Sequence, residues 1–233
     1  MQIYWPKIKK IVEESAEIKT YLLERPENFT WEEGAHTHFA LKGFNAGDKP
    51  NRSLIRHMSI STIPSEDVIG ITTRIKEQCS EFKSVLKSLN VGDEVALFKT
   101  HSSIPLKRVG RKVYLLSSGV GLATFRSIVL HYFDNPEGVE HMHSLNVESL
   151  KQFLFTDLVK TADDKNFTAQ FVDNRSTYYE EVQKLAADQE GLFYIVGSDE
   201  FLAQNIAILR EKGIPAEQIM LDKREEQRAE LLA

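Results

Sequence analysis

Apolar residues in the first half of the chain recur in short runs with the length of β-strands. These runs cover residues 2–13, 17–24, 38–41, 55–62, 68–75 and 94–98, and turns rich in Gly, Pro, Asp or Asn separate most of them, at 32–35, 45–51, 64–67 and 90–93. Residues 84–89 instead have the spacing of a short helix. Six short strands with one helix predict a small antiparallel β-barrel.

The second half of the chain alternates between strand-like and helix-like segments. Strands are predicted at 112–117, 139–145, 167–172, 192–196 and 218–221, and helices at 122–133, 148–160, 177–188 and 199–212. Such alternation favours a parallel sheet with helices on both faces. The rhythm changes near 105–110, so we expect two domains, 1–106 and 107–233, followed by a charged tail at 222–233 that is either docked or frayed.

A glycine turn follows the first predicted strand of the second half. Residues 112–126 read KVYLLSSGVGLATFR, which predicts a strand, a turn and a helix. Gly119 and Gly121 have no Cβ to block a ligand, and the helix after them directs free N–H groups towards the turn. This arrangement is typical of a phosphate-binding turn, with Thr124 where a third glycine often stands. A tight turn without a ligand is the alternative.

Composition narrows the possible classes of protein. Of the 233 residues 42% are apolar, which argues against a mainly disordered chain, and the net charge of −5 argues against nucleic acid as a main partner. The single cysteine, Cys79, excludes an internal disulfide framework and a four-cysteine metal or iron–sulfur site. No apolar run reaches the roughly 18 residues of a membrane helix, so we expect a soluble, cytoplasmic protein without membrane insertion.

Four short motifs occur along the chain in a particular order. They are RHMS at 56–59, LNVGDEV at 89–95, SGVGLATFR at 118–126 and FYIVGS at 193–198. Their order and spacing resemble the ferredoxin–NADP reductase superfamily over nearly the whole chain, without an iron–sulfur domain. The resemblance implies a flavin-binding antiparallel barrel followed by an α/β domain that binds NAD(P).

The first motif corresponds to the family's flavin motif, Arg-x-Tyr-Ser or Arg-x-Tyr-Thr. The resemblance implies that Arg56 binds flavin phosphate and that Ser59 hydrogen-bonds flavin N5, as the catalytic residue. His57 and Met58 complete the cofactor contact, but Met58 replaces a tyrosine that stacks on the flavin ring. A thioether can lie against a ring without forming a stacking plane. The alternative is an ordinary buried strand with an arginine at its end.

A second flavin element in the family is a turn at the start of a short helix. The matching stretch here, CSEFKS at 79–84, lacks the family's glycine but contains Lys83 and Ser84 as candidate phosphate ligands. The resemblance favours FAD, which has a pyrophosphate, and leaves FMN possible. An ordinary capped surface helix is the alternative.

The resemblance also implies the residues that bind the nicotinamide cofactor. The pyrophosphate contacts would come from Gly119, Val120, Gly121 and Thr124, and Gly197 with Ser198 would lie at the same edge of the sheet. Val196 stands where many relatives have a cysteine.

Residues 173–176 bear on the choice between the two nicotinamide cofactors. Arg175 and Ser176 suit the 2′-phosphate of NADPH, whereas Asp173 suits the 2′-hydroxyl of NADH. These residues favour NADPH slightly. The alternative for Arg175 is a solvated surface charge.

The function implied by the resemblance is flavin-dependent oxidoreduction. Hydride would pass from NAD(P)H to bound FAD, and electrons would then move to a separate acceptor such as ferredoxin or flavodoxin. The rival hypothesis is a redox-inactive regulatory or interaction module of the same fold, which Met58, Val196 and the missing glycine favour. His141 and His143 share one strand face, but no third metal ligand is evident, so a structural role is favoured.

Overall fold

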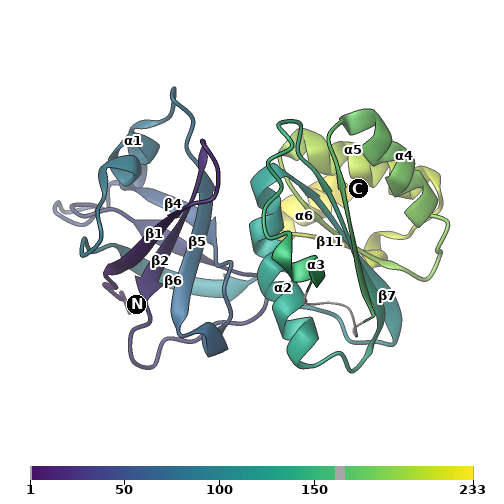
Figure 1. Cartoon of the computed structure of the whole chain (residues 1–233), viewed down its shortest axis with the longest axis horizontal. Coiled ribbons are helices and arrows are strands. Elements are labelled where there is room, and N and C mark those ends of the chain that lie inside the picture. Colours follow the sequence, from purple (N-terminus) through teal and green to yellow (C-terminus); the bar gives the residue numbers. More distant parts are fainter. Residues whose placement is uncertain (1, 161–165, 233) are drawn as a thin grey trace. The chain divides into compact units, whose positions relative to one another are not determined.

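The computed structural model describes residues 2–160 and 166–232 and divides the chain into two compact units, Met1–Ser102 and Ser103–Ala233 (Figure 1). An antiparallel barrel forms the first unit and an α/β unit with a parallel sheet forms the second, as the sequence predicted. Within the described residues, no helix has the length and apolar character needed to span a membrane.

Six strands form the first unit. They make two three-stranded antiparallel sheets, with strand orders β1-β2-β5 and β4-β3-β6. Backbone hydrogen bonds join the sheets on both sides: Ser61 N–H donates to the Gly70 carbonyl at 2.8 Å, and Tyr4 and Leu97 exchange two bonds of 2.9 Å. The barrel is therefore closed. Its elements are β1 (Ile8–Glu13), β2 (Ile18–Glu24), β3 (Ala35–Ala40), β4 (Ile55–Ser59), β5 (Val68–Arg74), α1 (Glu81–Ser88) and β6 (Ala96–Ser102).

Side chains that alternate along these strands fill the barrel, because successive residues of a strand point to opposite faces. The helix α1 packs on this core through Phe82 and Leu86, which are both fully buried. The Tyr21 hydroxyl donates to the Leu86 carbonyl at 2.9 Å and ties the helix to β2. Ser80 caps the start of α1 by accepting from the Lys83 N–H, as is usual for serine at this position.

A five-stranded parallel sheet forms the centre of the second unit, with the order β11-β10-β7-β8-β9. Figure 1 shows α2 and α3 on one face of this sheet and α4 and α5 on the other. Every residue of β10 is buried, as expected for a central parallel strand covered on both faces. The elements are β7 (Arg111–Ser118), α2 (Leu122–Asp134), β8 (Val139–Val147), α3 (Asp157–Lys160), β9 (Phe167–Val172), α4 (Arg175–Leu185), β10 (Leu192–Val196), α5 (Asp199–Glu211), β11 (Ile219–Leu221) and α6 (Glu225–Leu232).

One predicted element was wrong over most of its length. Residues 148–160 were expected to form a helix, but within the described part of that segment only Asp157–Lys160 is helical. The Glu148 N–H donates to the Val172 carbonyl at 3.0 Å, so the chain continues along β9 after β8 ends. Lys151 and Phe155 then adopt positive φ angles of 56° and 52°, which a right-handed helix does not allow.

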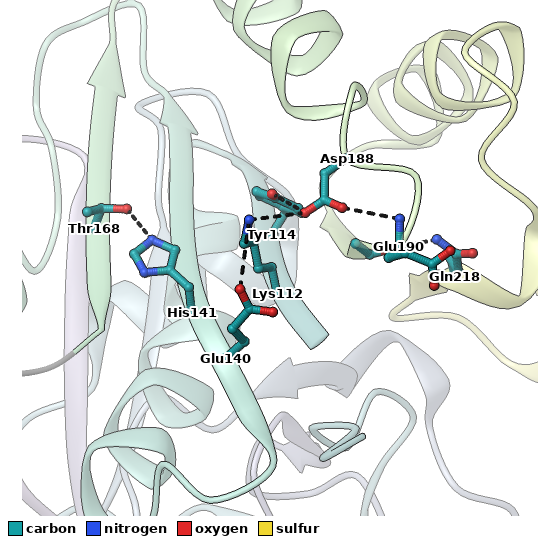
Figure 2. A network of polar contacts seen from close by, with 9 residues as sticks. Lys112, Tyr114, Glu140, His141, Thr168, Asp188, Glu190 and Gln218 are labelled. Atoms are coloured by element: carbon teal, nitrogen blue, oxygen red, sulfur yellow. Dashed lines mark hydrogen bonds and ion pairs between the residues drawn. The ribbon is translucent and has the colours of Figure 1, made fainter. Parts of the chain in front are cut away.

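A polar network connects the amino ends of the parallel strands (Figure 2). The Tyr114 hydroxyl donates to Asp188 at 2.7 Å, and the Lys112 ammonium lies 3.9 Å from both Asp188 and Glu140. The Gln218 side chain donates to the Gly191 carbonyl at 2.8 Å. These bonds tie the starts of β7, β8, β10 and β11 together, at the edge opposite the glycine turn.

The imidazoles of His141 and His143 converge on one hydroxyl in the same region. Their ring nitrogens lie 2.9 and 2.7 Å from Thr168 Oγ1, so both rings are within hydrogen-bonding distance of this oxygen. The second nitrogen of His143 is buried and has no hydrogen-bond partner in the described part of the chain. Burial, followed by repulsion from His141, lowers the pKa of His143 to about 4.

We expect acid to destabilise the second unit through His143. An unfolded histidine takes up a proton near pH 6.5, whereas native His143 stays neutral down to about pH 4. Between these values the unfolded chain binds a proton that the native protein does not bind, so the unfolding free energy falls as the pH drops from 6.5 to 4. Above pH 6.5 the ring is neutral in both states and this loss of stability is absent. Replacing His143 by Gln should flatten the pH dependence of the unfolding free energy from pH 6.5 to 4. Urea unfolding followed by circular dichroism tests this. An unchanged slope in the variant would contradict the proposed burial of the neutral ring.

A second prediction concerns Tyr194, which is fully buried on β10. Its hydroxyl accepts from the Lys107 N–H at 2.7 Å and donates to the Pro105 carbonyl at 3.1 Å. Tyr194→Phe leaves both backbone groups without this hydrogen-bond partner and should lower the unfolding free energy of the second unit by about 1–3 kcal/mol. Tyr179→Phe, at an exposed hydroxyl, is the control. Circular dichroism suits the measurement because both tryptophans, Trp5 and Trp31, lie in the first unit.

Candidate functional site

The glycine turn lies at the carboxyl end of β7. Residues Gly119–Gly121 form a single 3-10 turn, and α2 begins at the next residue. Gly119 has a φ angle of 55°, which favours glycine. Asn146 on β8, only 1% exposed, holds the turn by donating to Ser117 Oγ at 2.8 Å and to the Gly119 carbonyl at 3.3 Å. Sequence reasoning missed Asn146, although an amide within an apolar strand is a signal that could have identified it.

The turns after β7 and β10 touch each other at this edge. A Cβ on Gly121 would lie 2.8 Å from the Val196 carbonyl oxygen, and a Cβ on Gly197 would lie 2.4 Å from the Phe201 ring. The two strands are parallel neighbours, with Ser117 opposite Val196. Both glycines are therefore required by the packing of the chain itself, and a bound ligand is not needed to explain them.

The two hydroxyl residues predicted at this edge differ in access. Ser198 is exposed and caps α5, because its side chain accepts from the Phe201 N–H at 3.3 Å. Thr124 is only 2% exposed, in the first turn of α2. A hydroxyl buried in this way packs inside the unit and does not reach the surface where a phosphate would bind.

Arg175 begins α4, just beyond the carboxyl end of β9. Its guanidinium group donates to the Tyr179 hydroxyl at 2.9 Å and lies 5.2 Å from the centre of the Phe201 ring. The side chain is exposed, and so is Ser176, whose hydroxyl lies 3.4 Å from Glu180. The Phe201 ring thus packs against both Gly197 and Arg175, and links the two candidate binding elements.

Asp173 places a carboxylate at the same end of β9. It forms an ion pair with Lys151 at 2.8 Å and accepts a 3.0 Å hydrogen bond from the Asn174 side chain. These partners, Lys151 first, hold the pKa of Asp173 below its usual value, so the carboxylate is ionised at neutral pH. The end of β9 therefore presents the guanidinium of Arg175 beside a carboxylate that is already paired with Lys151.

In the barrel unit, β4 divides the predicted flavin motif between two faces. Arg56 lies opposite Phe39 and Met58 lies opposite Thr37, whereas His57 and Ser59 lie opposite His38 and His36. Met58 is 8% exposed and belongs to the barrel core. It is therefore packed among the side chains of the barrel, and not presented as a surface on which a ring could stack.

Two cations come together where β4, β5 and α1 meet. The Arg56 guanidinium lies 4.9 Å from the centre of the Phe82 ring and donates to three backbone carbonyls, the shortest bond being 2.7 Å to Ile55. The Lys83 ammonium donates to the Thr73 hydroxyl. Burial, and then the positive charge of Arg56, lowers the pKa of Lys83 to about 8.

No carboxylate of the described residues forms an ion pair with Arg56 or Lys83. The start of α1 lies beside them, and helix N-termini attract anions. Like charges that are partly removed from water are costly unless an anion offsets them. This group of residues therefore fits a phosphate, and Ser84 is exposed one residue further along the helix.

Comparisons with known proteins agree on the fold. The sequence matches no family model and no curated protein. A ferredoxin NADP+ reductase from Neisseria gonorrhoeae, solved with bound FAD and NADP, superposes with a TM-score of 0.80 at 16% identity, over 95% of this chain and 98% of its own. Ferredoxin-NADP+ reductase from Plasmodium falciparum gives 0.76 at 15% identity, over 94% and 95%.

A third solved structure extends this similarity to another kind of reductase. The cytochrome b5 reductase domain of Ulva prolifera nitrate reductase gives a TM-score of 0.76 at 13% identity, over 94% of this chain and 97% of its own. All three structures match almost end to end, and at these identities the likeness concerns the fold. The chain therefore shares the fold of these three reductases.

Proposed function

We propose that this protein is an NAD(P)H-dependent flavoprotein reductase. It takes hydride from NAD(P)H onto FAD held by the barrel unit and passes the electrons to a separate acceptor, such as ferredoxin or flavodoxin. The observation that carries the proposal is the pair of cations formed by Arg56 and Lys83, which lies at the start of α1 and has no carboxylate partner in the described chain.

The chemistry of this cation pair favours a dinucleotide. A guanidinium group binds phosphate through two parallel hydrogen bonds, and an ammonium group acts as a compact point charge beside it. Two cations and a helix N-terminus match the two negative charges of the FAD pyrophosphate. FMN has a single phosphate, and its binding is the alternative outcome of the same experiment.

In the second unit, the carboxyl edge of the sheet supports binding of the nicotinamide cofactor. Open α/β sheets bind ligands at this edge, and here the turn at Gly119–Gly121 and the capped start of α5 at Ser198 lie on neighbouring strands. Val120 belongs to the same turn. The exposed Arg175 and Ser176 suit a 2′-phosphate, while Lys151 already pairs with Asp173. NADPH is therefore the preferred donor and NADH the second.

The bound flavin would supply the chemistry of hydride acceptance at N5. The chain's own residues position and polarise it. Arg56 and Lys83 would hold the pyrophosphate, and the Ser59 hydroxyl at the end of β4 would donate a hydrogen bond to N5. Met58 would contact the flavin only if its side chain leaves the barrel core, where it is packed.

A second candidate function is a redox-inactive module that binds nucleotides. The burial of Met58 favours it, because the barrel does not present a ring-stacking side chain at that position. The packing of Gly121 against Val196 and of Gly197 against Phe201 also explains both glycines without a ligand. Such a module would bind nucleotide without turnover.

The visible spectrum of purified protein, before and after anaerobic addition of NADPH, tests the proposal. We expect flavin absorbance, either on purification or after incubation with FAD, that bleaches on addition of NADPH. NADPH-dependent reduction of a dye should accompany the bleaching. A colourless protein that does not take up FAD or FMN would overturn the reductase proposal. Nucleotide binding without bleaching would favour the redox-inactive module.

A substitution at Lys83 tests the phosphate site directly. Lys83→Met removes one cation while keeping an apolar stem, and FAD affinity should fall about 10- to 100-fold, the range for a lost hydrogen bond to a charged group. In the unmodified chain, FAD affinity should weaken as pH rises above about 8, because the ammonium then loses its proton. Fluorescence titration with FAD measures both effects.

The matched control is Lys87→Met, which changes an exposed lysine on the same helix. It should leave FAD affinity and its pH dependence unchanged. If Lys83→Met binds FAD as tightly as the control and with the same dependence on pH, Lys83 is not a ligand of the phosphate.

A further inference from the structure

A surface cavity of about 360 Å³ lies in the barrel unit, where β6 meets the start of the chain. Its lining comes from three segments that are far apart in the sequence: Gln2 and Tyr4 before β1, residues 28–30 between β2 and β3, and residues 98–100 on β6. Ligand pockets usually have volumes of roughly 300–1,000 Å³. The cavity therefore suits a small organic molecule.

This cavity is separate from the candidate phosphate site. Around the closed barrel, β6 pairs with β3 on one side and with the segment before β1 on the other. Arg56 instead lies on β4, and Lys83 lies on the helix that follows β5. Neither of these cations lines the cavity, so binding of flavin phosphate does not account for it.

Three aromatic rings form walls of the cavity, from Tyr4, Phe29 and Phe98. Tyr4 and Phe29 meet edge to face, with ring centres 4.9 Å apart and an angle of 87° between the ring planes. Phe29 and Phe98 are only 3% and 5% exposed, so packing against the rest of the barrel unit fixes both rings. Rigid aromatic walls favour a ligand that itself contains a flat ring.

Phe98 is held by a layer of rings on the outer face of the β4-β3-β6 sheet. Its ring centre lies 5.0 Å from that of His38, which it faces across the strands, and 5.4 Å from that of Phe44. Residues that face each other in antiparallel strands project to the same side. The same face therefore also carries His36, His57 and His101.

The polar residues around the cavity supply one cation and no carboxylate. Lys99 contributes the cation, and Gln2, Asn28 and Thr30 contribute amide and hydroxyl donors. Within the part of the chain that the structure describes, these four side chains form no hydrogen bond or ion pair with the protein. Their donors are therefore available to a ligand, and the charge they present is positive.

The backbone beside the cavity adopts an uncommon conformation at two places. Asn28 and Lys99 have φ angles of 64° and 51°, in the left-handed region that residues other than glycine rarely adopt. At Lys99 the cause is a β-bulge, in which Lys99 and Thr100 together face the single residue Thr37 on β3. Such conformations concentrate at ligand sites, where they direct a side chain towards its partner.

We propose that this cavity binds a small aromatic monocarboxylate. The aromatic walls would contact the ring of the ligand, the Lys99 ammonium would pair with its carboxylate, and the Gln2 and Asn28 amides would donate hydrogen bonds to it. A single ammonium group matches one negative charge, whereas phosphate is usually held by a guanidinium group or by several backbone N–H groups. This site is additional to the proposed reductase function and does not depend on it.

Calorimetric titration of the full chain with 2-naphthoate tests the proposal. We expect saturable binding to one site. The neutral 2-naphthalenemethanol keeps the rings without the charge, and decahydro-2-naphthoate keeps the charge without the aromatic rings. Both should bind about 10-fold more weakly or worse, because each lacks one of the two features that the cavity would recognise.

Lys99→Met removes the cation and keeps an unbranched side chain. The affinity for 2-naphthoate should fall about 10- to 100-fold, the range for a lost hydrogen bond to a charged group, while binding of 2-naphthalenemethanol stays unchanged. The matched control is Lys9→Met, which changes an exposed lysine on β1 that does not line the cavity. It should bind 2-naphthoate as the unmodified chain does.

Asn28→Gly separates binding from folding. Glycine adopts a φ angle of 64° without steric cost, so the midpoint of thermal unfolding should not fall. The affinity for 2-naphthoate should nevertheless fall several-fold, because the amide donor is lost. A variant that keeps its thermal midpoint and its full affinity would contradict the role of Asn28 in the site.

The outcomes distinguish this site from the proposed flavin site. Absence of 2-naphthoate binding, equal affinity for the acid and the alcohol, or full affinity in Lys99→Met would overturn the proposal. Binding that is lost in Lys83→Met and kept in Lys99→Met would also overturn it, because the acid would then occupy the candidate phosphate site. A chain that binds no flavin and still binds 2-naphthoate in a Lys99-dependent way would support the cavity and contradict only the reductase proposal.

Discussion

Closure of the barrel by backbone hydrogen bonds determines what each side chain of β4 can contact. Bonds between Ser61 and Gly70 and between Tyr4 and Leu97 join the two sheets, so one face of every strand lies inside the barrel. Because side chains alternate, Arg56 and Met58 share one face of β4, whereas His57 and Ser59 share the other. The position of the candidate phosphate site is a consequence of this alternation.

The cation pair shows how burial prepares a site for a ligand. Lys83 lies on a short helix that packs on the barrel through Phe82 and Leu86, and this packing brings its ammonium group close to Arg56. Neither group is neutralised by a carboxylate of the described chain. The repulsion between the two positive charges is therefore an unfavourable free energy that a bound anion would offset. At the carboxyl edge of the second unit, by contrast, Asp173 and Lys151 already neutralise each other.

The sequence was most informative where local patterns and tertiary packing agree. The six barrel strands and the strands of the parallel sheet were predicted because each has apolar residues at the spacing its burial requires. The helix expected at 148–160 was wrong because backbone pairing after β8 and two residues with positive φ overrode a weak helical pattern. Asn146 was missed because its bonds to Ser117 and Gly119 join residues 27 or more positions apart.

The sequence by itself determined the order of elements, the glycine turn after β7 and the residue types of the candidate flavin motif, because these depend on local spacing and composition. Only the tertiary structure decided that Met58 packs in the barrel core, that Lys83 is partly buried beside Arg56 and that four histidines from three strands share one face. Such features depend on which distant segments become neighbours. Burial, like-charge repulsion and ring contacts arise only once the barrel has closed.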